Sequence, residues 1–146
     1  VVSLGRGTEH PFEMYGSPDM SLFSYKFVPR SMPGALHPDY EGQECSGVDL
    51  TSLTYEEIWR NGINLNYIVN AYSMLMSLPG ADRERGLLPD GRPFFGRNPF
   101  IDKLIGNSWV REMIIDGCSP EDIKSMWKDD VERFKSLRRK YLLYNE

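Results

Sequence analysis

The chain has 146 residues, a formal net charge of −4, 40% hydrophobic residues and three tryptophans. This composition is typical of one globular domain with a sizeable core and does not fit a disordered chain. The acidic balance argues against nucleic-acid binding, and no apolar run approaches the roughly 18 residues that span a bilayer. We therefore predict a single domain over residues 1–146, with no transmembrane segment.

The chain opens with an arginine between two glycines, in SLGRGT (residues 3–8). Glycine allows a left-handed backbone and close approach of a ligand, and arginine offers a planar fork of donors to carboxylates and phosphates. The stretch is neither a Walker loop nor a dinucleotide fingerprint, because the further glycines and the strand–helix setting are missing. A ligand-binding loop and a tight turn with a surface arginine both remain open.

Short strands are predicted in the first third of the chain. The stretch Leu22–Val28 is rich in β-favouring residues and ends at Pro29. A long irregular loop follows over residues 30–44, because turn residues are frequent there. The stretch Ser46–Leu53 is predicted to form a second strand.

Helices are predicted in the remainder. Asn64 is suited to cap a helix that Pro79–Gly80 stops, with one apolar face made of Leu65, Ile68, Val69, Tyr72, Leu75 and Met76. A turn-rich connection, residues 81–99, leads to a short helix over residues 100–106. Asn107 then caps a helix that ends at Gly117.

The last helix has the clearest signals. Ser119 is a good N-cap, Pro120 fits the first helical position, and acidic residues follow at the positive end of the helix dipole. Its apolar residues recur at helical spacing and are predicted to be core: Ile123, Met126, Trp127, Val131, Phe134, Leu137 and Tyr141. The fold class is therefore α+β, with a small N-terminal β-sheet region, three or four packed helices and a long C-terminal amphipathic helix.

The sequence gives little support for a metal site or for catalytic residues. His10 and His37 are the only histidines, and the acidic residues near His37 do not have zinc-ligand spacing. No nucleophile motif occurs, and carboxylate pairs are easily found by chance in an acidic chain. We predict no catalytic residue, metal ligand or cofactor in this chain. Cys45 and Cys118 form one disulfide or, as we favour, two separate thiols.

Three ordered blocks resemble one family: SLGRGTEHPFEMYGSP, FVPRSMPGALHPDYEGQECSGVDL and the stretch from FIDKLIG to KYLLY. They look like the C-terminal part of the NamZ-type exo-β-N-acetylmuramidases, and the resemblance runs from Val2 to Tyr144. It implies a C-terminal α+β domain of a longer two-domain protein. The preceding Rossmann-like α/β domain would hold the catalytic glutamate, and the substrate cleft would lie between the two domains.

The implied activity is release of N-acetylmuramic acid from the non-reducing ends of peptidoglycan fragments, in an exported protein of the periplasm or cell envelope. The GRGT loop would face the cleft, with Arg6 binding the lactyl carboxylate or a sugar hydroxyl. Gly5 and Gly7 would permit close approach, and Thr8 would add a hydroxyl contact. Further candidates, each equally open to a structural role, lie in the same blocks: His10, Glu13, Arg30 and His37.

Two alternatives stay open: a non-catalytic carbohydrate- or envelope-binding module, and a purely structural or interaction domain. A domain separated from its partner is expected to expose an apolar patch around SLGRGT. A self-sufficient binding module is expected to show a formed pocket with aromatic faces for sugar stacking.

Overall fold

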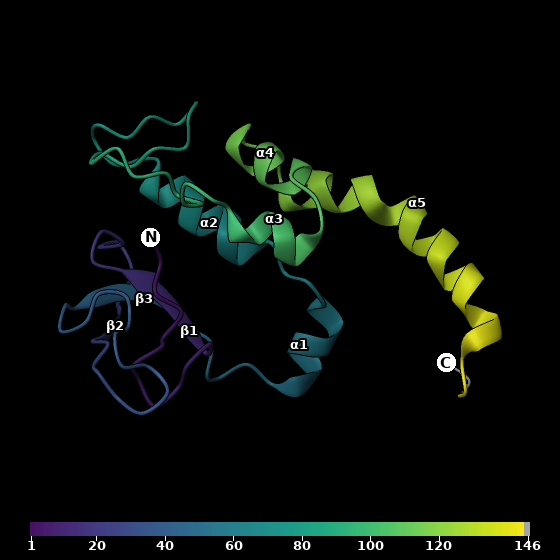
Figure 1. Cartoon of the computed structure of the whole chain (residues 1–146), viewed down its shortest axis with the longest axis horizontal. Coiled ribbons are helices and arrows are strands. Elements are labelled where there is room, and N and C mark those ends of the chain that lie inside the picture. The colour runs from purple at the N-terminus through teal and green to yellow at the C-terminus, as the bar shows by residue number, and fades with distance from the viewer. Residues whose placement is uncertain (145–146) are drawn as a thin grey trace.

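A computed structural model describes residues 1–144 and shows a small sheet beside a group of helices (Figure 1). The strand-first, helix-last order confirms the predicted α+β class, although the described residues form five α-helices rather than three or four. The elements are β1 (Met14–Ser17), β2 (Tyr25–Phe27), β3 (Cys45–Asp49), α1 (Tyr55–Asn61), α2 (Asn66–Leu75), α3 (Phe100–Ile105), α4 (Trp109–Ile115), α5 (Pro120–Arg138) and the 3₁₀ turn η1 (Arg139–Tyr141).

The sheet is antiparallel and has the order β1-β3-β2, so its central strand is the last in sequence. Gly16 of β1 pairs with Gly47 of β3, where a Cβ on Gly47 would overlap the Tyr15 carbonyl. Ser3 extends the sheet, exchanging backbone hydrogen bonds of 2.8 and 3.0 Å with Gly16. The SLGRGT stretch therefore begins at the edge of the sheet.

Both predicted strands exist but are shorter than expected. The first is confined to Tyr25–Phe27, and the second ends at Asp49. Asp49 Oδ1 accepts hydrogen bonds from the backbone N–H and the hydroxyl of Thr51, which turns the chain. The sequence analysis missed β1, since Met14–Ser17 contains a glycine and a serine and has only one strongly β-favouring residue.

The main core surrounds α2. Of its predicted apolar face, Leu65, Tyr72, Leu75 and Met76 are buried and the other two residues pack against them, as expected. The Tyr72 ring meets Phe94 edge-on and stacks on Phe95, with centroids 5.2 and 6.0 Å apart. These contacts bring the turn-rich segment before α3 onto the core.

The short helices α3 and α4 lie where the sequence predicts them. The N-cap of α4 is Ser108, one residue after the predicted Asn107, but Asn107 Oδ1 accepts a hydrogen bond of 3.2 Å from the backbone N–H of Val110 in the first turn. Asp102 of α3 receives two nearly parallel hydrogen bonds from the Arg111 guanidinium of α4, at 2.9 and 3.0 Å. Both side chains are about one-fifth exposed, so this ion pair is largely shielded from water.

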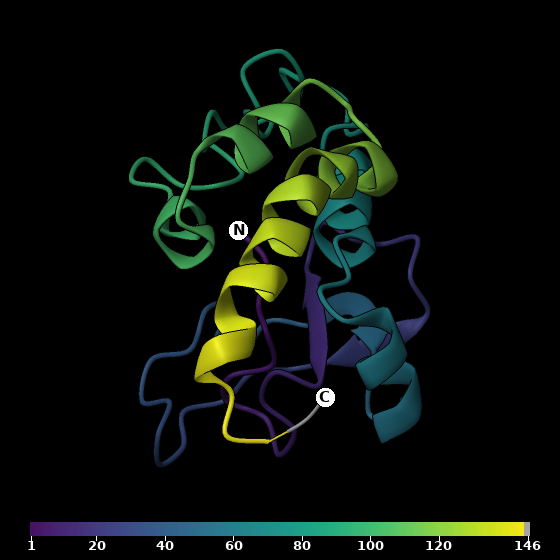
Figure 2. The same cartoon turned by 90° about the vertical axis from the view of Figure 1, so that its right-hand side faces the viewer.

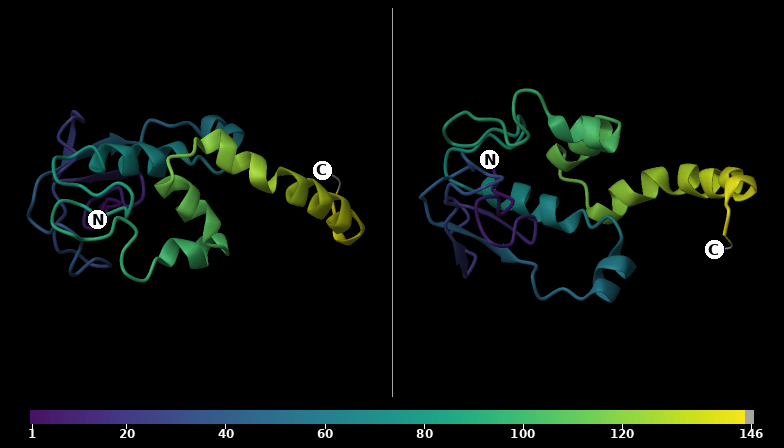
Figure 3. Two further views of the ribbon diagram at one scale, coloured as in Figure 1. Left: turned by 90° about the horizontal axis from the view of Figure 1, so that it is seen from above. Right: turned by 60° about the horizontal axis from the view of Figure 1, so that its bottom comes forward.

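Ser119 is the N-cap of helix α5, as predicted, and it forms a capping box that was not predicted: Ser119 and Asp122 each accept a hydrogen bond from the other's backbone N–H. The prediction that its apolar stripe is core was wrong beyond the first turns. Ile123 is buried and Trp127 partly buried, whereas the later apolar side chains, together with Met126, are exposed: Met126, Val131, Phe134, Leu137 and Tyr141. The second half of the helix runs past the rest of the domain, which accounts for the exposure of its apolar side chains (Figures 1 and 3).

Helix α1 was not predicted. Thr54 and Glu57 form a complete capping box at its start, but no residue of the helix is buried. Over residues 1–144, no helix is both long enough and apolar enough to cross a membrane.

Candidate functional site

The GRGT stretch forms a tight turn held by its own hydrogen bonds. Gly5 and Gly7 are buried and have left-handed backbone, with φ of 75° and 85°. The Gly5 carbonyl accepts hydrogen bonds from the backbone N–H and the hydroxyl of Thr8, at 3.1 and 2.7 Å. The Thr8 hydroxyl also accepts one from the His10 backbone N–H at 3.2 Å, so this hydroxyl stabilises the turn.

Other segments of the protein pack closely against the two glycines. A Cβ on Gly7 would lie 2.7 Å from both the Arg30 carbonyl oxygen and Pro38 Cγ. A Cβ on Gly5 would lie 2.6 Å from Met14 Cγ. The glycine pattern thus reflects close packing of the turn against the 30–38 loop and β1.

The turn presents Arg6 to a hollow. Arg6 Nη2 donates a hydrogen bond of 3.2 Å to the Gly34 carbonyl, the one hydrogen bond its side chain makes among the described residues. Arg6 and the segment from Gly34 to Pro38 line a hollow of about 410 Å³. His37 lies in it with its side chain 93% exposed, and its Nδ1 is 4.0 Å from Glu41 Oε2. The fold therefore brings together Arg6 and His37, which are distant in sequence.

Three other candidates do not line this hollow. His10 Nδ1 lies 3.2 Å from Glu13 Oε2, and both side chains are 57% exposed. Glu13 instead faces a smaller hollow of about 210 Å³ beside α1. Arg30 is exposed and touches the turn through its backbone N–H, which donates to the Gly7 carbonyl at 2.8 Å. The candidates thus do not form one cluster, because Arg6 and His37 share a hollow whereas His10 pairs with Glu13 outside it.

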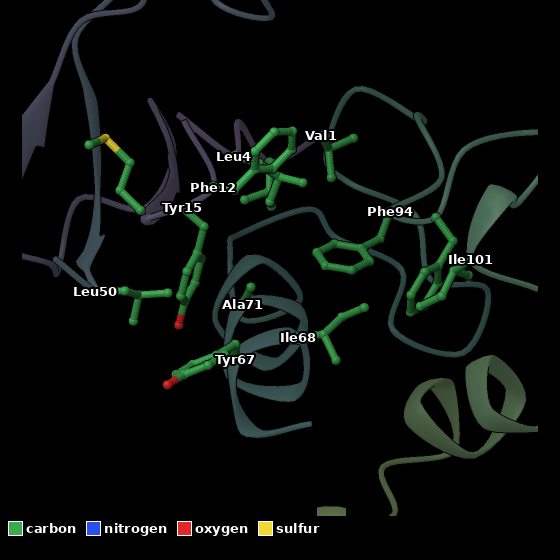
Figure 4. A pocket seen from close by; sticks show the side chains of 13 residues that line it. Val1, Leu4, Phe12, Tyr15, Leu50, Tyr67, Ile68, Ala71, Phe94 and Ile101 are labelled. Carbon is green, nitrogen blue, oxygen red and sulfur yellow. The ribbon is translucent and has the colours of Figure 1, made fainter. Parts of the chain in front are cut away.

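A third hollow, which the sequence analysis missed, is apolar and has a volume of about 390 Å³. Side chains from the N-terminal segment, α2 and the segment before α3 face it (Figure 4). Burial raises the pKa of the Tyr15 hydroxyl at its wall. The pair Phe94–Phe95, in an otherwise polar stretch, was the available signal. The lining includes Leu4, Phe12, Tyr15, Tyr67, Ile68 and Phe94.

Hydrogen bonds from turn and cap groups lower the pKa of the carboxyls of Asp49, Glu57 and Asp122, and none of these three residues lines a hollow described above. Within residues 1–144 no three His, Cys, Asp or Glu side chains cluster so as to hold a metal ion. Cys45 and Cys118 are separate thiols, the first buried in β3.

Comparison with known proteins identifies the family of the chain. Residues 1–144 match the model of the family described as exo-beta-N-acetylmuramidase NamZ, C-terminal. The chain belongs to this family. The NamZ resemblance read from the three sequence blocks is thereby confirmed.

Two NamZ-related proteins show how much of such proteins the chain represents. It is 27% identical to peptidoglycan beta-N-acetylmuramidase NamZ of Bacillus subtilis over 98% of the chain and 34% of that protein. It is 45% identical to a DUF1343 family protein of Bacteroides fragilis with a crystal structure, with a TM-score of 0.81 over 99% of the chain and 37% of that protein. The chain spans about a third of the length of the relatives it matches.

Proposed function

We propose that this chain is the C-terminal, cleft-forming domain of a peptidoglycan glycoside hydrolase that releases N-acetylmuramic acid from non-reducing ends. The observation that carries the proposal is NamZ family membership over residues 1–144. The chain spans about a third of the length of its relatives. In the proposed arrangement, an α/β domain earlier in the same polypeptide supplies the catalytic residue. The substrates, muramyl saccharides of peptidoglycan, place the protein in the periplasm or cell envelope.

Arg6 is the proposed substrate anchor. N-acetylmuramic acid carries a lactyl carboxylate, which a guanidinium fork binds with two parallel hydrogen bonds. The Gly34 contact engages one Arg6 nitrogen, and the hollow beside it holds His37 as a neighbouring donor. Gly5, Gly7 and Thr8 act by holding the turn that presents Arg6.

The second group of candidates has a weaker geometric case. The His10–Glu13 pair is more than half exposed and lies outside the hollow that Arg6 and His37 line. Arg30 contributes through its backbone to the position of the turn.

A non-catalytic carbohydrate-binding module is the second candidate. It is favoured by the aromatic wall of the apolar hollow, since sugar rings stack on such faces (Figure 4). The exposed side chains of Leu4 and Phe12 beside the same hollow also form the apolar patch expected of a domain with a partner. Both expected features are present, so they do not separate the two functions.

The test uses the intact polypeptide that contains this chain and a chromogenic β-glycoside of N-acetylmuramic acid. We expect the intact protein to release the sugar, and the same protein without residues 1–146 to be folded but inactive. Full activity of the truncated protein would reduce this chain to a binding or structural appendage. An inactive, folded intact protein would refute the proposed activity.

A further inference from the structure

One apolar stripe on α5 is buried at its start and uncovered along the rest of the helix. The stripe consists of Ile123, Trp127, Phe134 and Leu137. Successive members are four, seven and three residues apart, spacings that keep side chains on the same face of a helix. Ile123 is fully buried in the domain core, whereas Phe134 and Leu137 are both 58% exposed. The stripe that anchors α5 therefore continues beyond the domain without a partner (Figures 1 and 3).

Helix α1 presents a second uncovered apolar surface. Tyr55 and Trp59 are 77% and 74% exposed, and their rings stack with centroids 6.0 Å apart. Ile58 is 54% exposed on the same short helix. A helix of seven residues is marginal by itself and normally depends on packing.

The two helices that carry these residues lie on one side of the molecule. Helix α1 and the second half of α5 both project from the side that faces the viewer in Figure 2. At the base of α5, a hollow of about 420 Å³ lies among Ile63, Leu104, Trp109, Trp127 and Val131. Apolar side chains thus extend from Ile63, just before α2, across the first turns of α5 and along the apolar stripe of that helix.

We propose that in the intact protein this α1–α5 face, defined by Ile58, Trp59, Trp127, Phe134 and Leu137, is covered by the polypeptide that precedes residue 1. The inference rests on the proposed two-domain organisation and adds a second contact surface to the apolar patch of Leu4 and Phe12. The relatives have about two thirds of their length outside the matched region, enough for a domain that reaches both helices. A tethered domain is present at high effective concentration, which favours it over a second copy of the chain.

The proposal is tested by hydrogen–deuterium exchange on the intact polypeptide, together with its mass by light scattering over a wide concentration range. We expect slow exchange in residues 128–138 of a monomer, since a helix that projects into solvent exchanges rapidly. The double variant Phe134→Ser, Leu137→Ser should exchange in this stretch at least tenfold faster. Leu22→Ser, which alters a leucine 86% exposed outside the face, is the matched control and should change nothing.

Several outcomes would overturn the proposal. They are rapid exchange of residues 128–138 in the unaltered protein, protection that is lost on dilution together with a dimer mass, and a double variant whose protection is unchanged. Amides of α2 serve as the internal reference for folding, and if they also become labile in the double variant, Phe134→Ser alone replaces it. The exchange experiment does not depend on activity. If α5 is protected but the protein cleaves no muramyl glycoside, the proposed function is refuted and the proposed interface is retained.

Discussion

The backbone N–H of Arg30 donates a 2.8 Å hydrogen bond to the carbonyl of Gly7, which joins the GRGT turn to the loop that carries His37. Pro38 packs over the same glycine, at a distance that leaves no room for a Cβ. The hollow beside Arg6 therefore depends on contact between two segments that are far apart in sequence.

Gly7→Ala should destabilise the protein by about 2 kcal/mol or more, because a left-handed backbone costs roughly 1–2 kcal/mol and the new Cβ would also clash. Gly34→Ala is the matched control. Gly34 has a similar φ of 86° but open space around its Cβ position, so only the conformational cost of about 1 kcal/mol applies. Urea unfolding measures both, and equal losses would contradict the packing role of Gly7.

Arg6→Ala should raise KM for muramyl glycosides about tenfold or more in the intact protein, since a hydrogen bond to a charged group contributes about 1.5–3 kcal/mol. Arg6→Lys should recover only part of this loss, because lysine keeps the charge but not the fork. Arg85→Ala removes an arginine 78% exposed in the segment before α3 and serves as the control. Steady-state kinetics decide, and an unchanged KM for Arg6→Ala would refute its role as anchor.

Asp102→Ala should lower the free energy of unfolding by about 2 kcal/mol, because it leaves the shielded Arg111 guanidinium without its main partner. Asp130→Ala removes an ion pair with Arg133, in which the Arg133 and Asp130 side chains are 80% and 69% exposed. It should lower the free energy of unfolding by less than about 0.5 kcal/mol. Denaturant unfolding of the two variants measures both losses of stability. A small effect at Asp102 would show that the α3–α4 contact is not held by this ion pair.

Burial raises the pKa of the Cys45 thiol to about 11, from an ordinary value of 9.0. The folded state therefore holds the proton more tightly than the unfolded state, and this contribution to stability is complete below pH 9 and lost as the pH rises to 11. At pH 8 we expect iodoacetamide to label Cys118 and spare Cys45, and to label both in denaturant. Mass spectrometry counts the adducts, and rapid labelling of Cys45 in the folded protein would contradict its burial.

Signals confined to one segment were read correctly from the sequence. The Ser119 N-cap of α5 and the α2 apolar face are local patterns, and both appear as expected. The same periodicity in α5 predicted a core stripe and was wrong for Phe134 and Leu137. Helical spacing indicates which face is apolar but not how far the rest of the domain reaches along it.

Features that depend on tertiary contacts could not be predicted. The sequence singled out Arg6 and His37 separately, but their shared hollow arises from packing between the Gly7 turn and the 30–38 loop. The apolar hollow likewise requires Phe12, Ile68 and Phe94, from three separate parts of the chain, to line one space. Neither arrangement leaves a periodic pattern in one segment.

The central position of β3 has a consequence for how the N-terminal half folds. Both β1 and β2 pair with β3, so neither acquires its ladder until residues 45–49 arrive. That pairing closes the loop carrying His37 and Pro38, and closure of a loop costs chain entropy before the new contacts repay it. We therefore expect the sheet and the hollow beside Arg6 to form together, and a substitution that slows β3 docking to delay both.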